Sequence, residues 1–494
     1  MVVSLLDRER RLNEIGIALS KEPHIMHLLE LILESAAELT QADGATIYTV
    51  IEKKALKFQI FRTRSLHFKL GGKEGEPIPF ADIPLYHEDG SLDDRFTVTY
   101  AVNHRISVNI KDAYQEEGFD FSSTKIFDQK TGYRTRSVLA IPIFNHEGDA
   151  IALLQLINPI EGGCFSTDDQ QLAESLASQA GIALSNQQLI HNLRALFDSF
   201  TRILAHVIDE KSPITGHHAA RVPEITNLIA AAVNASGYAK LSDAEVYELQ
   251  TAAWLHDCGK IITPTYILEK RNKLEETIDG ILLVDRQLDL QIKDLEIALL
   301  KGEIDQQTFL GKTNEVELTR EFLHTCNHSS VTEEQQEKLK KLQDLGWITE
   351  SQLERLRIAK GNLTEAERKI MQDHVVMTIK ILSKLTYPKE LSQVPMIAGA
   401  HHEHLNGHGY PYGLVAEQLP LRCRILAIAD VFEALSAPDR PYKEKFPLSK
   451  VLSIMQKMCE EGHLDAALFK TFVDQKVYLT YAKRFLSPEQ IDMS

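Results

Sequence analysis

In the first third of the chain, short apolar segments alternate with segments whose apolar residues recur at helical spacing. Segments rich in Ile, Val and Leu predict four strands, at residues 44–51, 55–61, 137–144 and 150–157. Residues 24–40 carry apolar side chains at helical spacing, and a further helix is predicted to start at Ser166 or Thr167. The pattern predicts an α+β domain in which helices flank an antiparallel sheet.

A heptad pattern follows this domain. From residue 182, mostly apolar side chains recur in alternating steps of four and three, which is the spacing of a coiled coil. The positions of this seam are Ile182, Asn186, Leu189, Leu193, Leu196, Phe200, Ile203 and Val207. We interpret residues 187–210 as a linker helix that pairs two chains, and a single helix packed on its own domain as the alternative.

A helical segment is predicted over residues 271–362. Heptad spacing is kept there by Leu274, Ile278, Ile281, Leu288, Ile292, Leu295 and Leu299. Three capping-box sequences, at residues 332–335, 349–352 and 364–367, predict three further helix starts.

Length and charge limit the functional classes. A chain of 494 residues is too long for one ordinary core and predicts two or three domains. A net charge of −16 disfavours a nucleic acid polymer as partner. Five scattered cysteines without a CxxC pair argue against a disulfide framework or a zinc ribbon. Without a long apolar run or a signal-peptide pattern, we expect a cytoplasmic protein that does not enter a membrane.

Histidine and aspartate recur in the remaining chain, each inside an otherwise apolar helix or beside a glycine turn. They occur in TGHHAARV (215–222), WLHDCGKI (254–261), IMQDHVVM (370–377), HHEHLNGHGYPYGL (401–414) and RILAIADVFEAL (424–435). Imidazoles and carboxylates bind iron, manganese and zinc, and two such ions can hold a phosphate between them. Metal coordination would also offset the several kcal/mol that burial of these groups costs. The five segments together predict a two-metal site.

The first domain resembles a GAF domain, a fold that senses small ligands. The resemblance covers residues 1–186 and rests mainly on RSVLAIPIFNHEGDAIALLQLIN and the long helix after it. GAF domains that bind cyclic nucleotides carry an Asn-Lys, Phe and Asp-Glu signature. This chain has Asn158, Phe165 and Asp169, but Pro159 and Gln170 replace the Lys and the Glu. Cyclic-nucleotide sensing is therefore not expected. We interpret residues 1–186 as a GAF-like sensor domain that regulates the activity of the rest of the chain, with a structural or dimerising GAF domain as the alternative.

The histidine-rich segments, taken in order with RPYK (440–443), resemble the HD-GYP phosphodiesterases of the HD phosphohydrolase superfamily. The resemblance predicts an all-α HD-type domain over 211–494 with a helical insertion at 271–362. It also implies hydrolysis of a cyclic dinucleotide, cyclic di-GMP or cyclic GMP-AMP.

The resemblance implies a role for each matching residue. One metal would be held by His218, His256, Asp257 and Asp430, and the second by His374, His401 and His402, with Asp257 bridging. Both would be divalent ions, iron or manganese, and a hydroxide between them would be the nucleophile. Lys260 would stabilise the phosphate or pass a proton, while the substrate would be bound by Tyr410, Arg440 and Lys443.

Two departures from the family pattern change the expectation. Members with three metals carry a Glu four residues before the first ligand, where this chain has Ile214, so two metals are expected. The insertion at 271–362 also contains His324, Cys326 and His328, which are a weak candidate for an extra metal site.

Two other functions remain open from the sequence. The chain could hydrolyse cyclic GMP-AMP or another phosphoester, or it could be a receptor or scaffold that binds cyclic dinucleotides without cleaving them. In parts of the family, the Gly-Tyr-Pro loop contacts diguanylate cyclases, so such a contact is possible here.

Overall fold

The computed structural model describes residues 5–161, 163–211, 217–437 and 445–493. Two compact units divide the chain, Met1–Leu196 and Phe197–Ser494, and the division falls within one long helix. Within the described residues, none of the helices has both the length and the apolar character needed to cross a bilayer.

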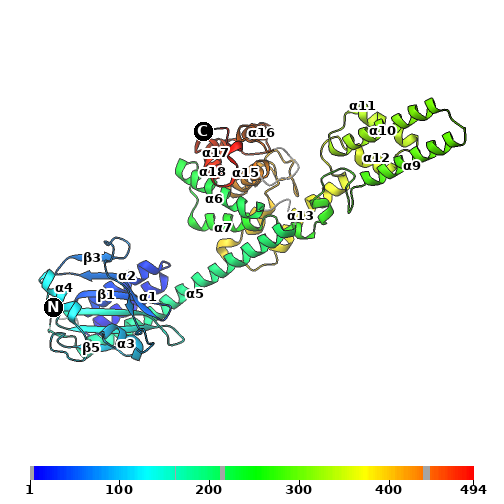
Figure 1. Cartoon of the computed structure of the whole chain (residues 1–494). Coiled ribbons are helices and arrows are strands. Elements are labelled where there is room, and N and C mark those ends of the chain that lie inside the picture. Colours follow the sequence, from blue (N-terminus) through cyan, green and yellow to red (C-terminus); the bar gives the residue numbers. More distant parts are fainter. Residues whose placement is uncertain (1–4, 162, 212–216, 438–444, 494) are drawn as a thin grey trace. The chain divides into compact units, whose positions relative to one another are not determined.

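The N-terminal unit combines helices with one sheet (Figure 1). Its helices are α1 (Leu5–Lys21), α2 (Ile25–Leu39), α3 (Thr97–His104), α4 (Ser122–Thr131) and the first part of α5 (Thr167–Lys211). Its strands are β1 (Ala42–Ile51), β2 (Ala55–Thr63), β3 (Phe68–Gly71), β4 (Ile83–Pro84), β5 (Val108–Ile110), β6 (Val138–Phe144) and β7 (Ala150–Pro159). The strand order is β3-β2-β1-β7-β6-β5, with β4 also paired to β2, and every pairing is antiparallel.

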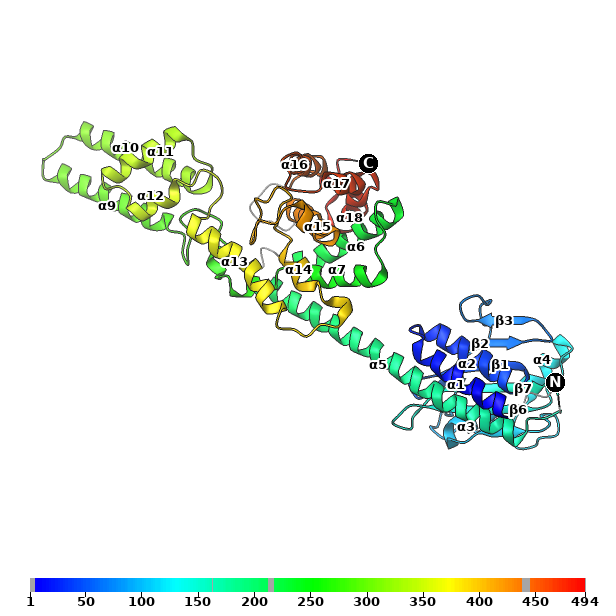
Figure 2. The same cartoon turned by 180° about the vertical axis from the view of Figure 1, so that it is seen from behind.

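Alternation along the strands gives the sheet two buried faces. Ile47 and Leu154 pack with α1, α2 and α5, whereas Tyr48 and Leu153 pack with α3 on the opposite face. Figure 2 shows α1, α2 and α5 along one side of this sheet. The predicted antiparallel sheet with flanking helices is confirmed. The sequence interpretation did not include α1, α3, α4 or the short strands β3, β4 and β5.

The residues that match the GAF signature have structural partners. Asn158 adopts a left-handed backbone conformation (φ 50°), and its side-chain oxygen accepts from the N–H groups of Arg136 and Ser137. Asp169 accepts from Ser166 and pairs with Arg8 at 3.0 Å. These side chains therefore fix the connection between β7 and α5.

The C-terminal unit is helical and begins with the end of α5. Its first half comprises α6 (His218–Ser236), α7 (Asp243–Leu255), the 3-10 helix η2 (Cys258–Ile262), α8 (Thr265–Leu268), α9 (Ile281–Leu300), α10 (Gln306–His328), α11 (Glu333–Asp344) and α12 (Glu350–Leu356). Its second half comprises α13 (Glu365–Leu382), η3 (Lys389–Leu391), α14 (Val394–Gly399), η4 (Ala416–Gln418), α15 (Leu421–Ser436), α16 (Leu448–Glu460), α17 (Ala466–Asp474), α18 (Val477–Phe485) and η5 (Pro488–Gln490). The predicted all-α C-terminal region is confirmed.

Helices α9 to α12 have a small core of their own, which includes Leu288, Leu323 and Leu339. The predicted capping boxes are confirmed at the starts of α11, α12 and α13. The proposed heptad was wrong in its first positions, because Leu274 and Ile278 precede α9. Leu274 is buried there without being helical, and its carbonyl accepts from the N–H of Gly280 at 3.0 Å.

A buried ion pair ties the start of this segment to α13. The Lys270 ammonium lies 2.7 and 2.8 Å from the two carboxylate oxygens of Glu367, and Arg355 donates to the same carboxylate at 2.8 Å. Glu367 is also the N3 residue of the capping box that starts α13. The segment is therefore attached to the helix that carries His374.

Candidate metal centre

A close approach between η2 and α13 brings two parts of the site together. A Cβ on Gly259 would lie 1.9 Å from the carbonyl oxygen of His374, so only glycine fits there. The Thr378 hydroxyl accepts from the N–H of Gly259 at 2.9 Å and donates to the carbonyl of His256 at 3.0 Å. This contact spans the insertion and sets His256 and Asp257 beside α13.

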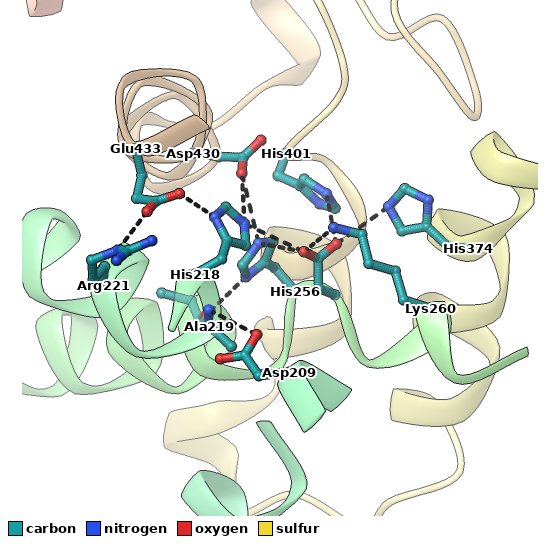
Figure 3. A network of polar contacts seen from close by, with 12 residues as sticks. Asp209, His218, Ala219, Arg221, His256, Lys260, His374, His401, Asp430 and Glu433 are labelled. Carbon is teal, nitrogen blue, oxygen red and sulfur yellow. Dashed lines mark hydrogen bonds and ion pairs between the residues drawn. The ribbon is translucent and has the colours of Figure 1, made fainter. Parts of the chain in front are cut away.

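Two groups of possible ligands result, one of His218, His256 and Asp257 and the other of His374, His401 and His402. Within each group the ligand atoms lie within 4.8 Å of one another. Figure 3 shows most of these side chains converging from α6, α13, α15, the turn between α7 and η2, and the residues that follow α14. All seven residues predicted as metal ligands, including Asp430, are therefore neighbours in the structure.

Asp257 lies between the two groups. Its Oδ2 is 3.4 Å from His218 Nε2 and 3.3 Å from His256 Nε2. Its Oδ1 is 3.4 Å from His374 Nε2 and 3.9 Å from His401 Nε2. A carboxylate with one oxygen toward each histidine group is suited to bridge two cations.

Asp430 adds a second carboxylate at the edge of the site. Its Oδ1 lies 3.3 Å from His218 Nε2 and its Oδ2 lies 3.9 Å from His402 Nδ1. Asp430 is buried on α15, a helix that is otherwise largely apolar. Its pKa lies well below the usual value, because pairing with His218 and His402 outweighs the effect of burial.

Backbone carbonyls fix the tautomers of three histidines. The Nδ1–H groups donate to carbonyls three residues earlier, from His256 to Ala253 at 2.6 Å, from His374 to Met371 at 2.5 Å and from His401 to Ala398 at 2.6 Å. Each Nε2 therefore carries a lone pair that is free to bind a metal.

Four buried polar atoms at the centre have no hydrogen-bond partner, namely Nε2 of His256, His374 and His401 and Oδ1 of Asp257. Each unsatisfied buried polar group costs about 1–3 kcal/mol. Four such atoms close together therefore indicate that another interaction compensates for this cost. Burial and the neighbouring His402 and His256 hold the pKa of His401 well below 6.5, and burial lowers that of His402 to about 4. These residues fit metal ions as their missing partners.

Glu433, which the sequence interpretation did not identify, orients His218. Its Oε2 is in contact with His218 Nδ1, and its Oε1 accepts from Arg221 Nε at 2.6 Å. Burial disfavours the charged imidazole, but the carboxylates of Glu433, Asp257 and Asp430 outweigh it and raise the pKa of His218. The signal in the sequence was the i, i+3 spacing of Asp430 and Glu433, which places both on one helix face.

Lys260 supplies positive charge beside Asp257. Its Nζ lies 2.5 Å from Asp257 Oδ2, one turn along the 3-10 helix. Burial would lower its pKa, but Asp257 outweighs that effect and raises it. Lys260 is therefore an ammonium ion in contact with the Asp257 carboxylate.

The Gly-Tyr-Pro loop is built on a buried carboxylate. Glu403 accepts from the N–H groups of Tyr412 at 2.7 Å and Leu414 at 2.9 Å. The ring of Tyr410 packs on that of His402, with 4.8 Å between centroids, and its N–H donates to the His402 carbonyl at 3.1 Å. Tyr410 therefore lies next to the second histidine group.

The other candidate residues are placed as follows. His217 is exposed before α6, His408 is exposed, and His404 packs on His463 at 3.4 Å between centroids. In the insertion, His324 pairs with Asp285 at 2.9 Å and His328 with Asn272 at 2.6 Å, and no metal group is found there among the described residues. Ile214, Arg440 and Lys443 lie outside the described residues.

Curated relatives match short parts of this chain. A 3'3'-cGAMP-specific phosphodiesterase of Vibrio cholerae is 45% identical over 20% of this chain and 20% of its own. A cyclic di-GMP phosphodiesterase response regulator of Xanthomonas campestris is 41% identical over 19% of this chain and 25% of its own. A dual cyclic-AMP and -GMP phosphodiesterase of Takifugu rubripes is 38% identical over 23% of this chain and 12% of its own. The chain thus spans a quarter or less of the length of these relatives.

Two family profiles match larger parts of the chain. The GAF domain profile matches residues 24–184, which contain the whole sheet, helices α2, α3 and α4 and the first part of α5. The HD domain profile matches residues 301–468, which contain His374, His401, His402 and Asp430. The chain therefore matches a GAF domain over residues 24–184 and an HD domain over residues 301–468, in the order that its sequence resemblance predicts.

Proposed function

We propose that the HD domain is an HD-GYP-type phosphodiesterase that hydrolyses a cyclic dinucleotide with two divalent metal ions. The observation that carries the proposal is the position of Asp257, whose two oxygens face two different histidine groups. A single structural metal would need only one such group.

The residues fit the metal ions that the proposal requires. His218, His256, Asp257 and Asp430 would hold one ion, and His374, His401 and His402 the other, with Asp257 shared. Imidazole and carboxylate ligands suit iron and manganese, which we propose as the ions. Held by these residues, two such ions would supply the chemistry that activates water and neutralises charge on a phosphate.

The surrounding side chains provide the remaining chemistry. Lys260 would attract a substrate phosphate and hold a proton at Nζ that can pass to the leaving oxygen. Tyr410, beside His402, offers an aromatic face to a base or sugar. We propose Arg440 and Lys443 as further phosphate contacts from their sequence position alone.

The substrate class is proposed from the relatives. Two of the similar phosphodiesterases are named for 3'3'-cGAMP and cyclic di-GMP. We propose cyclic di-GMP first and cyclic GMP-AMP as the alternative, because phosphates and metals would hold both in the same way. A receptor that does not cleave is less well supported, since no ligand position of the two-metal set is lost.

Two partners belong to the same proposal. We propose a homodimer through α5, where every apolar residue of the seam, Ile182, Leu189, Leu193, Leu196, Phe200, Ile203 and Val207, is exposed. We also propose that the Gly-Tyr-Pro loop can contact a diguanylate cyclase.

Product analysis tests the substrate. Purified protein loaded with iron(II) or manganese(II) would be incubated with cyclic di-GMP, 3'3'-cGAMP and cyclic AMP. We expect a linear dinucleotide or mononucleotides from the dinucleotides and little turnover of cyclic AMP. Binding of both dinucleotides without any cleavage, in protein with both metals present, would instead establish a receptor.

A further inference from the structure

The last turn of α5 contacts the segment that carries Lys260. Lys211, the final residue of α5, donates from Nζ to the carbonyls of Lys260 at 3.2 Å, Ile261 at 2.5 Å and Thr263 at 2.7 Å. These carbonyls lie at the C-terminal end of η2, where peptide carbonyls carry partial negative charge, and the Lys260 carbonyl also accepts from the Thr263 N–H at 3.0 Å. One ammonium group therefore satisfies the end of the 3-10 helix.

This contact bears directly on the position of Lys260. Its backbone N–H donates to the Asp257 carbonyl at 2.9 Å, and its own carbonyl is held by Lys211. With the main chain held at both sides, the side chain spans from η2 to Asp257 Oδ2 at 2.5 Å. Charge-assisted bonds of this kind are stronger than neutral ones, so loss of Lys211 frees the end of η2.

The same turn of α5 also contacts the start of α6. Asp209 Oδ1 accepts from the N–H of Ala219 at 3.3 Å, a contact that Figure 3 shows beside His218. His217, at the N-cap position, makes no side-chain cap of its own. Asp209 therefore serves as the capping acceptor of α6 from another helix, with the negative charge that a helix N-terminus favours.

We propose that Asp209 and Lys211 form a two-point clamp through which the end of α5 positions His218 and Lys260. Both are positioning residues, because neither is in contact with the metal groups themselves. The proposal rests on the proposed phosphodiesterase function. Because α5 also contributes Leu176 and Ala180 to the GAF-domain core, the clamp makes catalytic geometry depend on the helix that both domains share.

A double-mutant cycle tests whether Lys211 acts through Lys260. We expect Lys211→Met to lower kcat about tenfold to a hundredfold with little change in KM, which is the range seen when supporting residues are lost. In a Lys260→Met background, Lys211→Met should have little further effect, because the residue it positions is gone. Lys211→Arg should recover most of the activity, since a guanidinium can also donate to several carbonyls.

A matched variant controls for general damage to the helix end. Glu210→Gln changes a charge in the same turn, on an exposed side chain whose Oε1 lies 3.7 Å from His206 Nε2. It should keep wild-type kcat. Thermal unfolding of each variant shows whether the fold is intact.

Hydrogen exchange provides a readout that does not depend on catalysis. In the full-length protein, Lys211→Met should speed exchange in the peptide over residues 257–264, and Asp209→Ala should speed it at 217–221. Unchanged exchange at both segments, or fully additive effects of Lys211→Met and Lys260→Met on kcat, would overturn the clamp. If wild-type protein hydrolyses no cyclic dinucleotide, the proposed function fails while the exchange result still decides the clamp.

Discussion

Asp257 Oδ1 lies 3.4 Å from His374 Nε2, although the whole insertion separates the two residues in the chain. The approach depends on Gly259, whose Cα faces the backbone of α13 directly. The chain thus leaves the site after η2, forms the insertion and returns to the same site along α13. The distance between the two histidine groups therefore depends on how closely η2 packs against α13.

Gly259→Ala is expected to separate the two groups. The new Cβ would meet the His374 carbonyl at 1.9 Å and the Thr378 N–H at 2.6 Å, so one of the two segments must move. Overpacking of this kind costs about 1–3 kcal/mol or more. We expect a lower thermal midpoint and less than two metals per chain by elemental analysis.

Gly311→Ala is the matched control, because Gly311 lies within α10 with open space around its Cα. Alanine favours the helix by about 1 kcal/mol over glycine, so this variant should unfold slightly later and keep its metals. Equal metal loss in both variants would contradict the role given to Gly259.

Glu433→Gln is expected to weaken metal binding without unfolding the protein. The amide keeps the shape of the side chain but removes the negative charge that holds His218 and pairs with Arg221. Loss of such a partner typically costs about tenfold to a hundredfold in metal affinity. Competition with a chelator measures the change, and Glu460→Gln, on an exposed face of α16, should show none.

Lys273 predicts a pH dependence of the insertion. It is fully buried, its ammonium donates to the Leu356 carbonyl at 3.3 Å, and burial lowers its pKa from 10.5 to about 8. That difference corresponds to roughly 3 kcal/mol against the charged form. Between about pH 8 and 10.5 the unfolded chain keeps a proton that the folded chain has lost, so the free energy of unfolding rises with pH there.

Replacement of Lys273 by Met should remove this pH dependence and stabilise the insertion at pH 7. Thermal unfolding at pH 7 and pH 9.5 measures both effects. Lys340→Met, at an exposed side chain that pairs with Asp344 at 3.2 Å, should leave the dependence unchanged. The account of Lys273 is wrong if the thermal midpoint of Lys273→Met rises as much between pH 7 and pH 9.5 as that of the wild type.

Leu193→Glu is expected to dissociate the proposed homodimer. Leu193 is 64% exposed and Leu196 is 66% exposed, so the seam of α5 presents an apolar face that the proposed second helix would cover. Sedimentation velocity should show a dimer for wild type and a monomer for the variant. His191→Glu places the same charge off the seam and should remain dimeric; a monomeric wild type would refute the dimer.

Much of the fold follows from short-range patterns in the sequence. The strands predicted at 44–51 and 150–157 correspond to β1 and β7, because alternation and β-branched content act within a few residues. Capping boxes at Thr332, Thr349 and Thr364 are equally local and were found directly.

Long-range contacts explain what the sequence pattern missed. The sequence spacing of Leu274 fits the predicted heptad, but hydrogen bonds to Asn327 hold its segment in a non-helical conformation. Glu403 and Lys211 act through single backbone groups, which leave no periodic pattern in the sequence. The seven ligand candidates could be named because a family resemblance joined segments that no local pattern connects.

The measurement that tests the central claim most directly compares wild type with Asp257→Asn. An amide keeps the size of the side chain but cannot bridge two cations as a carboxylate does. We predict two metals per chain and hydrolysis of a cyclic dinucleotide for wild type and for the surface control Asp344→Asn, and loss of metal and hydrolysis for Asp257→Asn. Full metal content and unchanged hydrolysis in Asp257→Asn would contradict a two-metal centre built on this residue.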